Sequence, residues 1–564
     1  MKAELKQKLM SRERGKAELI VFIAYIAAVA VMGIFHEPWF DEAQAWSIGR
    51  SASFSDMIFK VPHYEGHPPL WYLLLAVPAK LGAPYEISLK LINLVICAAA
   101  VWLILYRSPF PKIIRCVIPF TFYFFYQTAV ICRPYSLTLL ALTLAAVGYK
   151  NRNEKPLRYI LPLILLCASH AFGIVIAGGL CMVWSAEIFA EAFRSGKPGR
   201  VFRDKRCYAL LLILAAAVFF IFLIIPAEDV YYNNMEEAAG QRILNNLNLL
   251  LIFPVDSLFG TYTEVDPFKQ TPIGFYLSLA GGAAVLLVLF AVTKKNKKLA
   301  TFAVPYFMFL GFGIWKYLYW NHIGVSTFFI MFTVWIIADS DDPALPEVFH
   351  KIRGKIESKL TLIIAKAAAV MMFAMPLAWT VYCSASDITE PYGMRQIAQY
   401  IKDNNIEGHT FMMYWEHKYN EEPSYEETFE PDYDIDKYYN RENRVNNTFH
   451  QGAGSTLSPY FDENIFYNFN IDSHSDQYMK YKTATDEENE HNFSEWRRYG
   501  YPEYMFCKCP LDAVFPELKY SDIDKMYDLI ERFDTNIFYK LSYEPSYLQI
   551  YKLKDEYIGK GKPQ

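Results

Sequence analysis

Long apolar runs fill roughly the first two thirds of this chain and constrain its fold more than any other feature. The first run, residues 19–35, is long enough to cross most of a bilayer. Similar runs follow at about 88–106, 113–131, 135–149, 158–169, 171–190, 208–226, 272–292, 300–319, 322–338 and 361–383. A helix satisfies its own backbone groups, as a bilayer requires. We therefore expect an α-helical polytopic membrane domain of about 11 spans, within a range of about 9 to 13.

Two segments leave that count open. The run at 70–83 is apolar but short, and it lies between two regions that the charge pattern places on the outer side. It could be a half-membrane or interfacial helix, or a true span with a neighbour that is not one. The short runs within 158–190 are equally ambiguous.

Composition divides the 564 residues into two unlike parts. Residues 1–384 hold the apolar runs, whereas residues 385–564 are polar, acidic and rich in Tyr. This predicts a membrane domain followed by a soluble domain. In the soluble part, residues 394–401 and 523–533 have helical spacing, and four segments favour strands, so we expect a small α/β domain. The four predicted strands are 410–415, 504–507, 536–539 and 548–551.

Basic clusters between the runs predict the orientation. Six basic residues precede the first run, and the strongest later cluster lies at 194–206. Placing all of them in the cytoplasm puts the N-terminus inside and the segments 37–87 and 227–271, with the C-terminal domain, outside the cell. The first run is expected to stay as an anchor, because residues 35–38 make a poor cleavage site.

Several function classes find no support in the sequence. Most of the nine cysteines lie in or beside apolar runs, and no CxxC pair or zinc spacing occurs. No Gly-rich phosphate loop appears, which argues against cytoplasmic nucleotide hydrolysis. We also expect no nucleic-acid partner.

Asp41 and Glu42 follow the first run directly. Two adjacent carboxylates at a membrane boundary are costly, so they predict a functional site. They could deprotonate a hydroxyl or bind a divalent cation such as Mg or Mn. Alternatively, the pair could simply cap an interfacial helix, because acidic residues favour helix N-termini.

More polar groups are expected on the same side of the membrane. Arg and Lys side chains there could bind a phosphate, which suits transfer of a group from a phosphorylated carrier. Each has a plainer alternative. His67 could mark only a helix start beside Pro68, Arg133 could snorkel, and His170 could be a core histidine. Lys316 and His322 could belong to an aromatic belt.

Three motifs together resemble the GT-C superfamily of membrane glycosyltransferases. They are Asp41-Glu42 after the first span, His67-Pro68-Pro69-Leu70, and Arg133-Pro134-Tyr135; Asn321-His322-Ile323-Gly324 adds a weaker match. The relatives in mind are the protein O-mannosyltransferases and the aminoarabinose transferases of lipid A. The resemblance covers residues 17–384 and does not extend into the tail.

That resemblance implies an inverting hexosyl- or pentosyltransferase with an extracytoplasmic active site. Its donor would be a polyprenyl-phosphate-linked sugar, and its acceptor a glycan, lipid or protein of the cell envelope. By position, Asp41 would be the general base or a metal ligand, and Glu42 would support it or share the metal. Arg133 would hold the donor phosphate, and further substrate contacts would come from His67, Tyr135, His170, Lys316 and His322.

Two other classes remain as alternatives. A transporter or flippase for a lipid-linked or polar solute would place ionisable residues at mid-membrane depth and show internal symmetry. The sequence shows neither feature. A non-catalytic assembly protein would use the Tyr-rich tail to bind a partner or a glycan.

Overall fold

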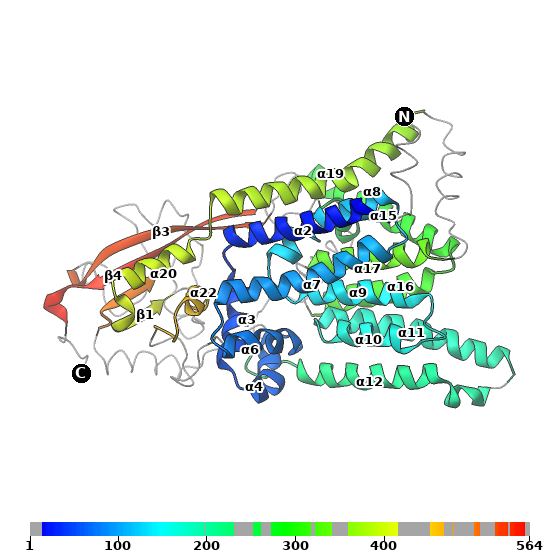
Figure 1. Ribbon diagram of the computed structural model, residues 1–564, viewed down its shortest axis with the longest axis horizontal. Helices are drawn as coiled ribbons and strands as arrows, with labels where there is room; N and C mark the ends of the chain where they lie inside the picture. Colours follow the sequence, from blue (N-terminus) through cyan, green and yellow to red (C-terminus); the bar gives the residue numbers. More distant parts are fainter. Residues whose placement is uncertain are drawn as a thin grey trace.

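The computed structural model describes residues 14–196, 198–230, 252–260, 272–316, 322–340, 359–414, 452–466, 478, 501–507, 525–539 and 542–558. Much of the predicted outer segment 227–271 lies outside these residues. The described part is mainly helical, with a small sheet near the C-terminus (Figure 1).

Apolar helices of the described residues run side by side as a bundle (Figure 1). Six helices in the described residues are long and apolar enough to cross a membrane, and five apolar helices are shorter. The count of about 11 spans remains a prediction. The bundle helices are α2 (Lys16–Phe35), α7 (Tyr85–Arg107), α9 (Tyr135–Tyr149), α10 (Leu157–Cys167), α11 (Ala171–Arg194), α12 (Lys205–Leu223), α15 (Pro272–Lys295), α16 (Leu299–Trp315), α17 (Ile323–Ala338) and α19 (Lys359–Thr389).

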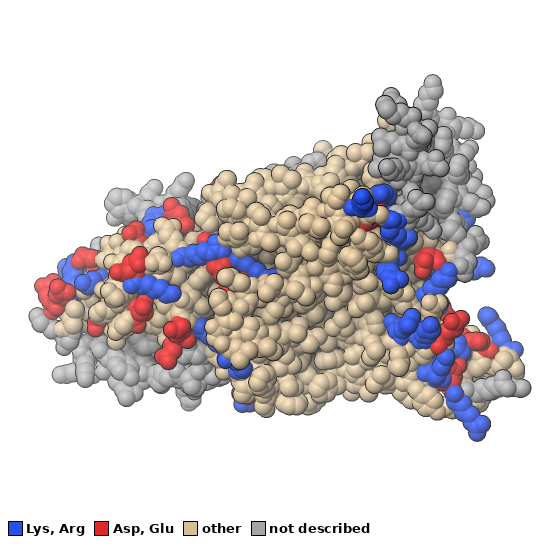
Figure 2. Space-filling view, in the orientation of Figure 1, with Lys and Arg blue, Asp and Glu red and all other residues tan. Residues whose placement is uncertain are grey.

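Charge and burial both fit a bundle in an apolar solvent. On the face shown in Figure 2, charged side chains gather toward the two ends and leave a broad uncharged band between them. Helix α17 is apolar all round and lies inside the bundle, where every residue except Val334 is buried. Helices α11 and α16 approach closely at Gly179, where a Cβ would lie 2.5 Å from Pro305 Cα.

Short helices cover the end of the bundle that faces the C-terminal domain (Figure 1). The ambiguous run 70–83 forms α6, an 11-residue helix about 16 Å long, which is half the thickness of a bilayer core. It packs against α3, with Trp46, Trp71 and Leu75 buried between them. The short helices are α3 (Phe40–Ser51), α4 (Phe54–Phe59), α5 (Val61–Glu65) and α6 (Leu70–Lys80).

The run 113–131 is not the single helix that the sequence predicted. It forms α8 (Lys112–Val117), the 3-10 turn η1 (Ile118–Phe120) and the π-helical turn η2 (Tyr126–Val130). Pro119 has no N–H and obstructs a continuing helix. The broken backbone is satisfied by α19: Phe122 N–H donates to the Pro376 carbonyl at 3.1 Å, and the Thr380 hydroxyl donates to the Phe120 carbonyl at 2.8 Å. Non-helical backbone is tolerated at this depth because it is buried in protein.

The tail forms a four-stranded sheet in the order β1-β2-β4-β3 with α20 packed on it. Strands β1 and β2 are parallel, and the other two pairings are antiparallel. The helix at 394–401 and the four predicted strands are confirmed. Of the helix predicted at 523–533, residues 523 and 524 lie outside the described residues, and residues 527–533 form a strand instead. That segment enters β3, where pairing along β4 overrides its local helical spacing. The elements are α20 (Met394–Asp403), β1 (Phe411–Tyr414), β2 (Tyr504–Cys507), β3 (Tyr527–Tyr539) and β4 (Ser542–Leu553).

Three further features join the tail to the bundle. Helix α19 continues to Thr389, past the predicted boundary at 384/385. The short helix α22 (Gly452–Leu457) and the 3-10 turn η9 (Ser458–Tyr460) pack against α3. Arg50 of α3 donates to the Phe461 carbonyl at 2.7 Å. The sheet is therefore attached to the end of the bundle where α3 lies.

Candidate functional site

Asp41 and Glu42 lie in the first turn of α3 but contact different partners. Glu42 is fully buried, and its Oε2 accepts from the Trp39 N–H at 2.8 Å, which caps the helix. Its Oε1 accepts from the Cys132 N–H at 2.6 Å. The helix-cap alternative therefore describes Glu42.

Asp41 faces Arg133. Its Oδ2 lies 3.1 Å from Arg133 Nη2, and the Asp41 side chain is 39% exposed against 14% for Arg133. Arg133 occupies the turn between η2 and α9, and its Cζ lies 5.3 Å from the centre of the Tyr135 ring. Glu42 and Cys132 are the sequence neighbours of these two residues, so their hydrogen bond also holds the Asp41 and Arg133 backbones together.

Three histidines from distant segments meet beside this ion pair. The ring centre of His170, at the N-cap of α11, lies 4.6 Å from that of His67 and 5.6 Å from that of His322. His170 also stacks on Tyr135 at 5.4 Å. We call Asp41, His67, Arg133, Tyr135, His170 and His322 the histidine cluster. The structure thus brings six of the eight predicted site residues together.

Each histidine has its own environment. His67 Nδ1 lies 2.6 Å from the Glu65 carbonyl oxygen. Burial, reinforced by the charge of Arg133, lowers the pKa of His67 to about 4. His170 is buried, and its Nδ1 accepts from the Phe172 N–H at 3.2 Å, so the core-histidine alternative holds for it as well. His322 is also buried, against Phe172 at 4.5 Å.

Glu65 adjoins the cluster; the sequence places it among the outward-facing polar groups but does not single it out as a catalytic or substrate-binding residue. Gln44 Nε2 donates to its Oε1 at 3.0 Å, and the Tyr72 hydroxyl lies 3.5 Å from its Oε2. Burial raises the pKa of Glu65 to about 8 against the hydrogen bond from Gln44, and the charge of Asp41 adds to the rise. The sequence signal that could have pointed to Glu65 is its position two residues before His67. No sequence signal pointed to its hydrogen-bond partners Gln44 and Tyr72.

A cavity of about 490 Å³ lies against Glu65. It is formed between the α4–α5 segment and the chain that follows α12, where the Tyr64 hydroxyl donates to Asp229 at 3.1 Å. Its polar lining includes Asp56, Lys60, His63, Tyr64, Glu65 and Glu228. The cavity is therefore a water-accessible space beside the histidine cluster.

Two predicted site residues are not in the cluster. Glu42 is committed to backbone groups and to His36. Lys316 Nζ lies 5.3 Å from the Trp315 ring, and no contact among the described residues joins it to the histidines.

Both adjacent carboxylates, which the sequence suggested as divalent-cation ligands, have protein partners in the structure. Glu42 directs both oxygens to other groups, while Asp41 contacts Arg133. Within the described ranges, no three His, Cys, Asp or Glu side chains are placed to hold a metal ion.

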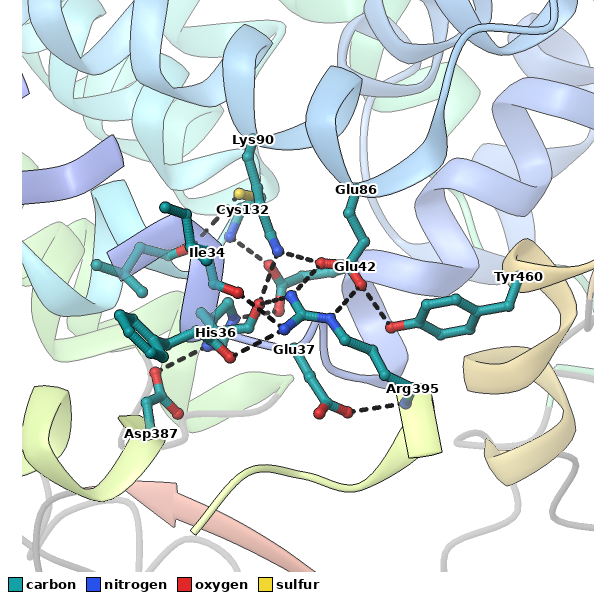
Figure 3. Close-up of polar contacts among 12 residues, drawn as sticks. Ile34, His36, Glu37, Glu42, Glu86, Lys90, Cys132, Asp387, Arg395 and Tyr460 are labelled. Atoms are coloured by element: carbon teal, nitrogen blue, oxygen red, sulfur yellow. Dashed lines mark hydrogen bonds and ion pairs between the residues drawn. The ribbon is translucent and has the colours of Figure 1, made fainter. Parts of the chain in front are cut away.

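Glu42 belongs to a second polar network, which we call the clasp: His36, Glu37, Glu42, Glu86, Lys90, Asp387, Arg395 and Tyr460 (Figure 3). His36 bridges two carboxylates, with Nε2 3.2 Å from Glu42 and Nδ1 2.9 Å from Asp387. Burial alone lowers the pKa of His36, but the charges of Asp387 and Glu42 overcome it and raise that pKa to about 10.

Arg395 forms the other half of the clasp. From α20 it donates to the carbonyls of Ile34 at 2.8 Å and His36 at 3.0 Å, where α2 ends. Its Nε also donates to Glu86 at 2.7 Å, and the Tyr460 hydroxyl donates to the same carboxylate at 2.9 Å (Figure 3). The clasp therefore joins the ends of α2 and α7 to the C-terminal domain.

Comparison of the chain with protein-family models, with curated proteins and with solved structures found no match.

Proposed function

We propose that this protein is a membrane glycosyltransferase that transfers a sugar from a polyprenyl-phosphate donor to an extracytoplasmic acceptor. The acceptor would be a glycan, lipid or protein of the cell envelope. One observation carries the proposal: the Asp41 carboxylate pairs with Arg133 at 3.1 Å beside three histidines and a polar cavity. A base and a phosphate-binding cation are the minimum that this reaction needs.

Arg133 is proposed to bind the donor phosphate. A guanidinium can form two parallel hydrogen bonds with phosphate oxygens and stabilise the charge that builds on the leaving group. That phosphate is already anionic, so the reaction needs no general acid. Because Arg133 pairs with Asp41, the donor phosphate would compete for the guanidinium and release the carboxylate.

Asp41 is then proposed as the general base. It is the more exposed member of the ion pair, at 39%, so an acceptor hydroxyl can approach it. Asp41 would take the hydroxyl proton while the acceptor oxygen attacks the anomeric carbon and the C1–O bond to phosphate breaks, with inversion. Glu65, whose pKa is about 8, would be largely neutral at pH 7 and would not add a second negative charge beside Asp41.

This function also requires a particular orientation of the protein in the membrane. The N-terminus and the basic clusters would be cytoplasmic, and the histidine cluster and the C-terminal domain would face the outside, with about 11 spans between them. Single cysteines placed at Ser53, the N-cap residue of α4, and at Asp403 on α20 test this, because both positions are exposed. An impermeant maleimide should label both on intact cells; protection of Ser53→Cys until the cells are lysed would contradict the proposal.

The direct test compares envelope glycans, by mass spectrometry, in cells that have or lack this protein. The wild type should restore a missing sugar, and Asp41→Asn should reduce its transfer by about 10²–10⁴-fold, as expected for a lost general base. The matched control is Asp403→Asn on α20, which removes an exposed carboxylate bonded to Gln399. Full activity of Asp41→Asn, at wild-type abundance in the membrane, would refute the assignment.

A further inference from the structure

His67 carries a buried nitrogen, Nε2, that has no hydrogen-bond partner in the described structure. Its other nitrogen, Nδ1, lies 2.6 Å from the Glu65 carbonyl oxygen. A carbonyl can only accept, so Nδ1 carries the ring proton. In a neutral imidazole this leaves a lone pair on Nε2. The side chain is therefore held as a hydrogen-bond acceptor.

His67 is also held neutral. Its pKa lies near 4 because of burial and the nearby Arg133 guanidinium. A proton on Nε2 would place a second positive charge beside that guanidinium. At neutral pH, Nε2 can therefore accept a hydrogen bond from an O–H or N–H group, but its lone pair repels a phosphate or carboxylate oxygen.

The surroundings indicate what approaches this nitrogen. The His67 ring meets His170 edge-on at 4.6 Å, and His170 stacks on Tyr135, whose hydroxyl is also buried and unpartnered. Arg133 lies over the same Tyr135 ring at 5.3 Å. Burying a polar atom without a partner is costly, so such an atom favours binding a ligand that supplies one. An acceptor and a hydroxyl, each lacking a partner, thus lie beside a cation suited to phosphate.

We propose that His67 Nε2 accepts a hydrogen bond from a hydroxyl group of the donor sugar. This inference rests on the proposed function, in which Arg133 binds the donor phosphate. In a polyprenyl-phosphate sugar the sugar is bonded directly to the phosphate, so a group beside the phosphate-binding arginine faces that sugar. Arg133 binds the anion and His67 binds the hydroxyl, which together fix the direction in which the headgroup enters.

Lipid binding by the purified full-length protein in detergent tests this division. The probes are polyprenyl phosphate without a sugar and its glucosyl, mannosyl and aminoarabinosyl esters. The wild type should bind at least one ester more tightly than the sugar-free lipid. His67→Asn keeps a donor near the Glu65 carbonyl but no longer reaches the Nε2 position. It should weaken binding of that ester by about three- to tenfold, as expected for one neutral hydrogen bond, and leave the sugar-free lipid unchanged.

Two further variants complete the design. His67→Gln places an amide near the Nε2 position and should retain more of the preference for the sugar than His67→Asn does. Arg133→Gln should weaken the sugar-free lipid and the esters alike. In ¹⁵N-histidine NMR of the wild type, the Nε2 resonance of His67 should shift on adding the preferred ester but not on adding sugar-free lipid. This readout needs no variant that might misfold.

The outcomes separate the two proposals. The role of His67 would be overturned if His67→Asn kept the wild-type preference for the ester, or if it lost affinity equally for the ester and the sugar-free lipid. It would also be overturned if the Nε2 resonance did not shift when the ester binds. Each of these results would leave the proposed function standing. Binding of none of the lipids by the wild type would instead contradict the proposed function.

Discussion

Asp41 and Glu42 are neighbours in sequence, but their carboxylates belong to two regions with different properties. Asp41 is partly exposed and contacts one arginine, and its charge acts on Glu65, which lines a polar cavity. Glu42 is fully buried and bonded to two backbone N–H groups and to His36. Polar groups that are fully satisfied stabilise a fold, whereas groups left exposed or unpartnered are available to a ligand. The comparison therefore favours the histidine cluster as the place of the proposed chemistry and the clasp as a structural attachment of the C-terminal domain.

The two arginines give the strongest test of this division. Arg133→Gln removes the proposed phosphate contact and should reduce sugar transfer by about 10²–10³-fold. Its ion pair with the partly exposed Asp41 contributes little stability, so the melting temperature should change little. Arg395→Gln, the matched change in the clasp, removes the bonds to Ile34, His36 and Glu86.

For Arg395→Gln the effects should be reversed. We expect a loss of about 1–3 kcal/mol in stability and a smaller loss of transfer. Glycan mass spectrometry and thermal unfolding in detergent measure the two quantities. If both variants lost activity and stability in the same proportion, the clasp and the cluster would be one functional unit.

A second comparison changes the adjacent acids. Glu42→Gln puts an amide N–H where the carboxylate accepts from Trp39 and Cys132, so one backbone donor loses its acceptor. We expect a cost of about 1–3 kcal/mol, measured by thermal unfolding. Asp41→Asn should change stability by less than about 1 kcal/mol, because an exposed ion pair contributes little. A larger loss of stability for Asp41→Asn than for Glu42→Gln would contradict the assignment of Glu42 as the structural carboxylate and Asp41 as the catalytic one.

The composition of the cluster could be predicted in large part from the sequence. His67, Arg133, His170 and His322 each lie at an end of an apolar run, and the charge pattern placed those ends on one side. Residues at the same membrane face lie in one layer, so only a few arrangements of these side chains relative to one another are possible. The sequence could not show that Glu42 and Lys316 lie outside the cluster, because a side chain's direction depends on its packing.

The clasp and part of the tail could not be predicted in this way. His36 and Asp387 are separated by 351 positions, and no local pattern links them. The sequence indicated only that Arg395 is a polar residue in the segment 394–401, which has helical spacing. The first part of β3 was predicted as a helix because its helical spacing is local, whereas its pairing with β4 is a tertiary effect. Pro119 was the one local signal against a helix at 113–131.

The pH dependence of stability should reveal the clasp. The pKa of His36 is raised to about 10 from 6.5, so the folded protein binds a proton that the unfolded chain releases between those values. The stability from His36 is fully present below about pH 6.5 and is lost as pH rises through 10. Asp387→Asn removes one of the two anions and should flatten this loss. Equal slopes between pH 7 and 10 in the two proteins would contradict the assignment.

The smallest effect is expected at Glu65, where stability again falls as pH rises, but over a lower pH range. Its pKa is raised to about 8 from 4.5, so the folded state holds a proton that the unfolded chain has released, and stability falls as pH rises between these values. Glu65→Gln removes this titration while keeping the side-chain shape. The variant should melt like the wild type near pH 4.5 and a few degrees higher near pH 8, an increment limited by solvent in the adjoining cavity. If Glu65→Gln melted at a lower temperature than the wild type at pH 8, the folded state would need the ionised Glu65 carboxylate. The cluster would then hold a second negative charge beside Asp41, contrary to the proposed function.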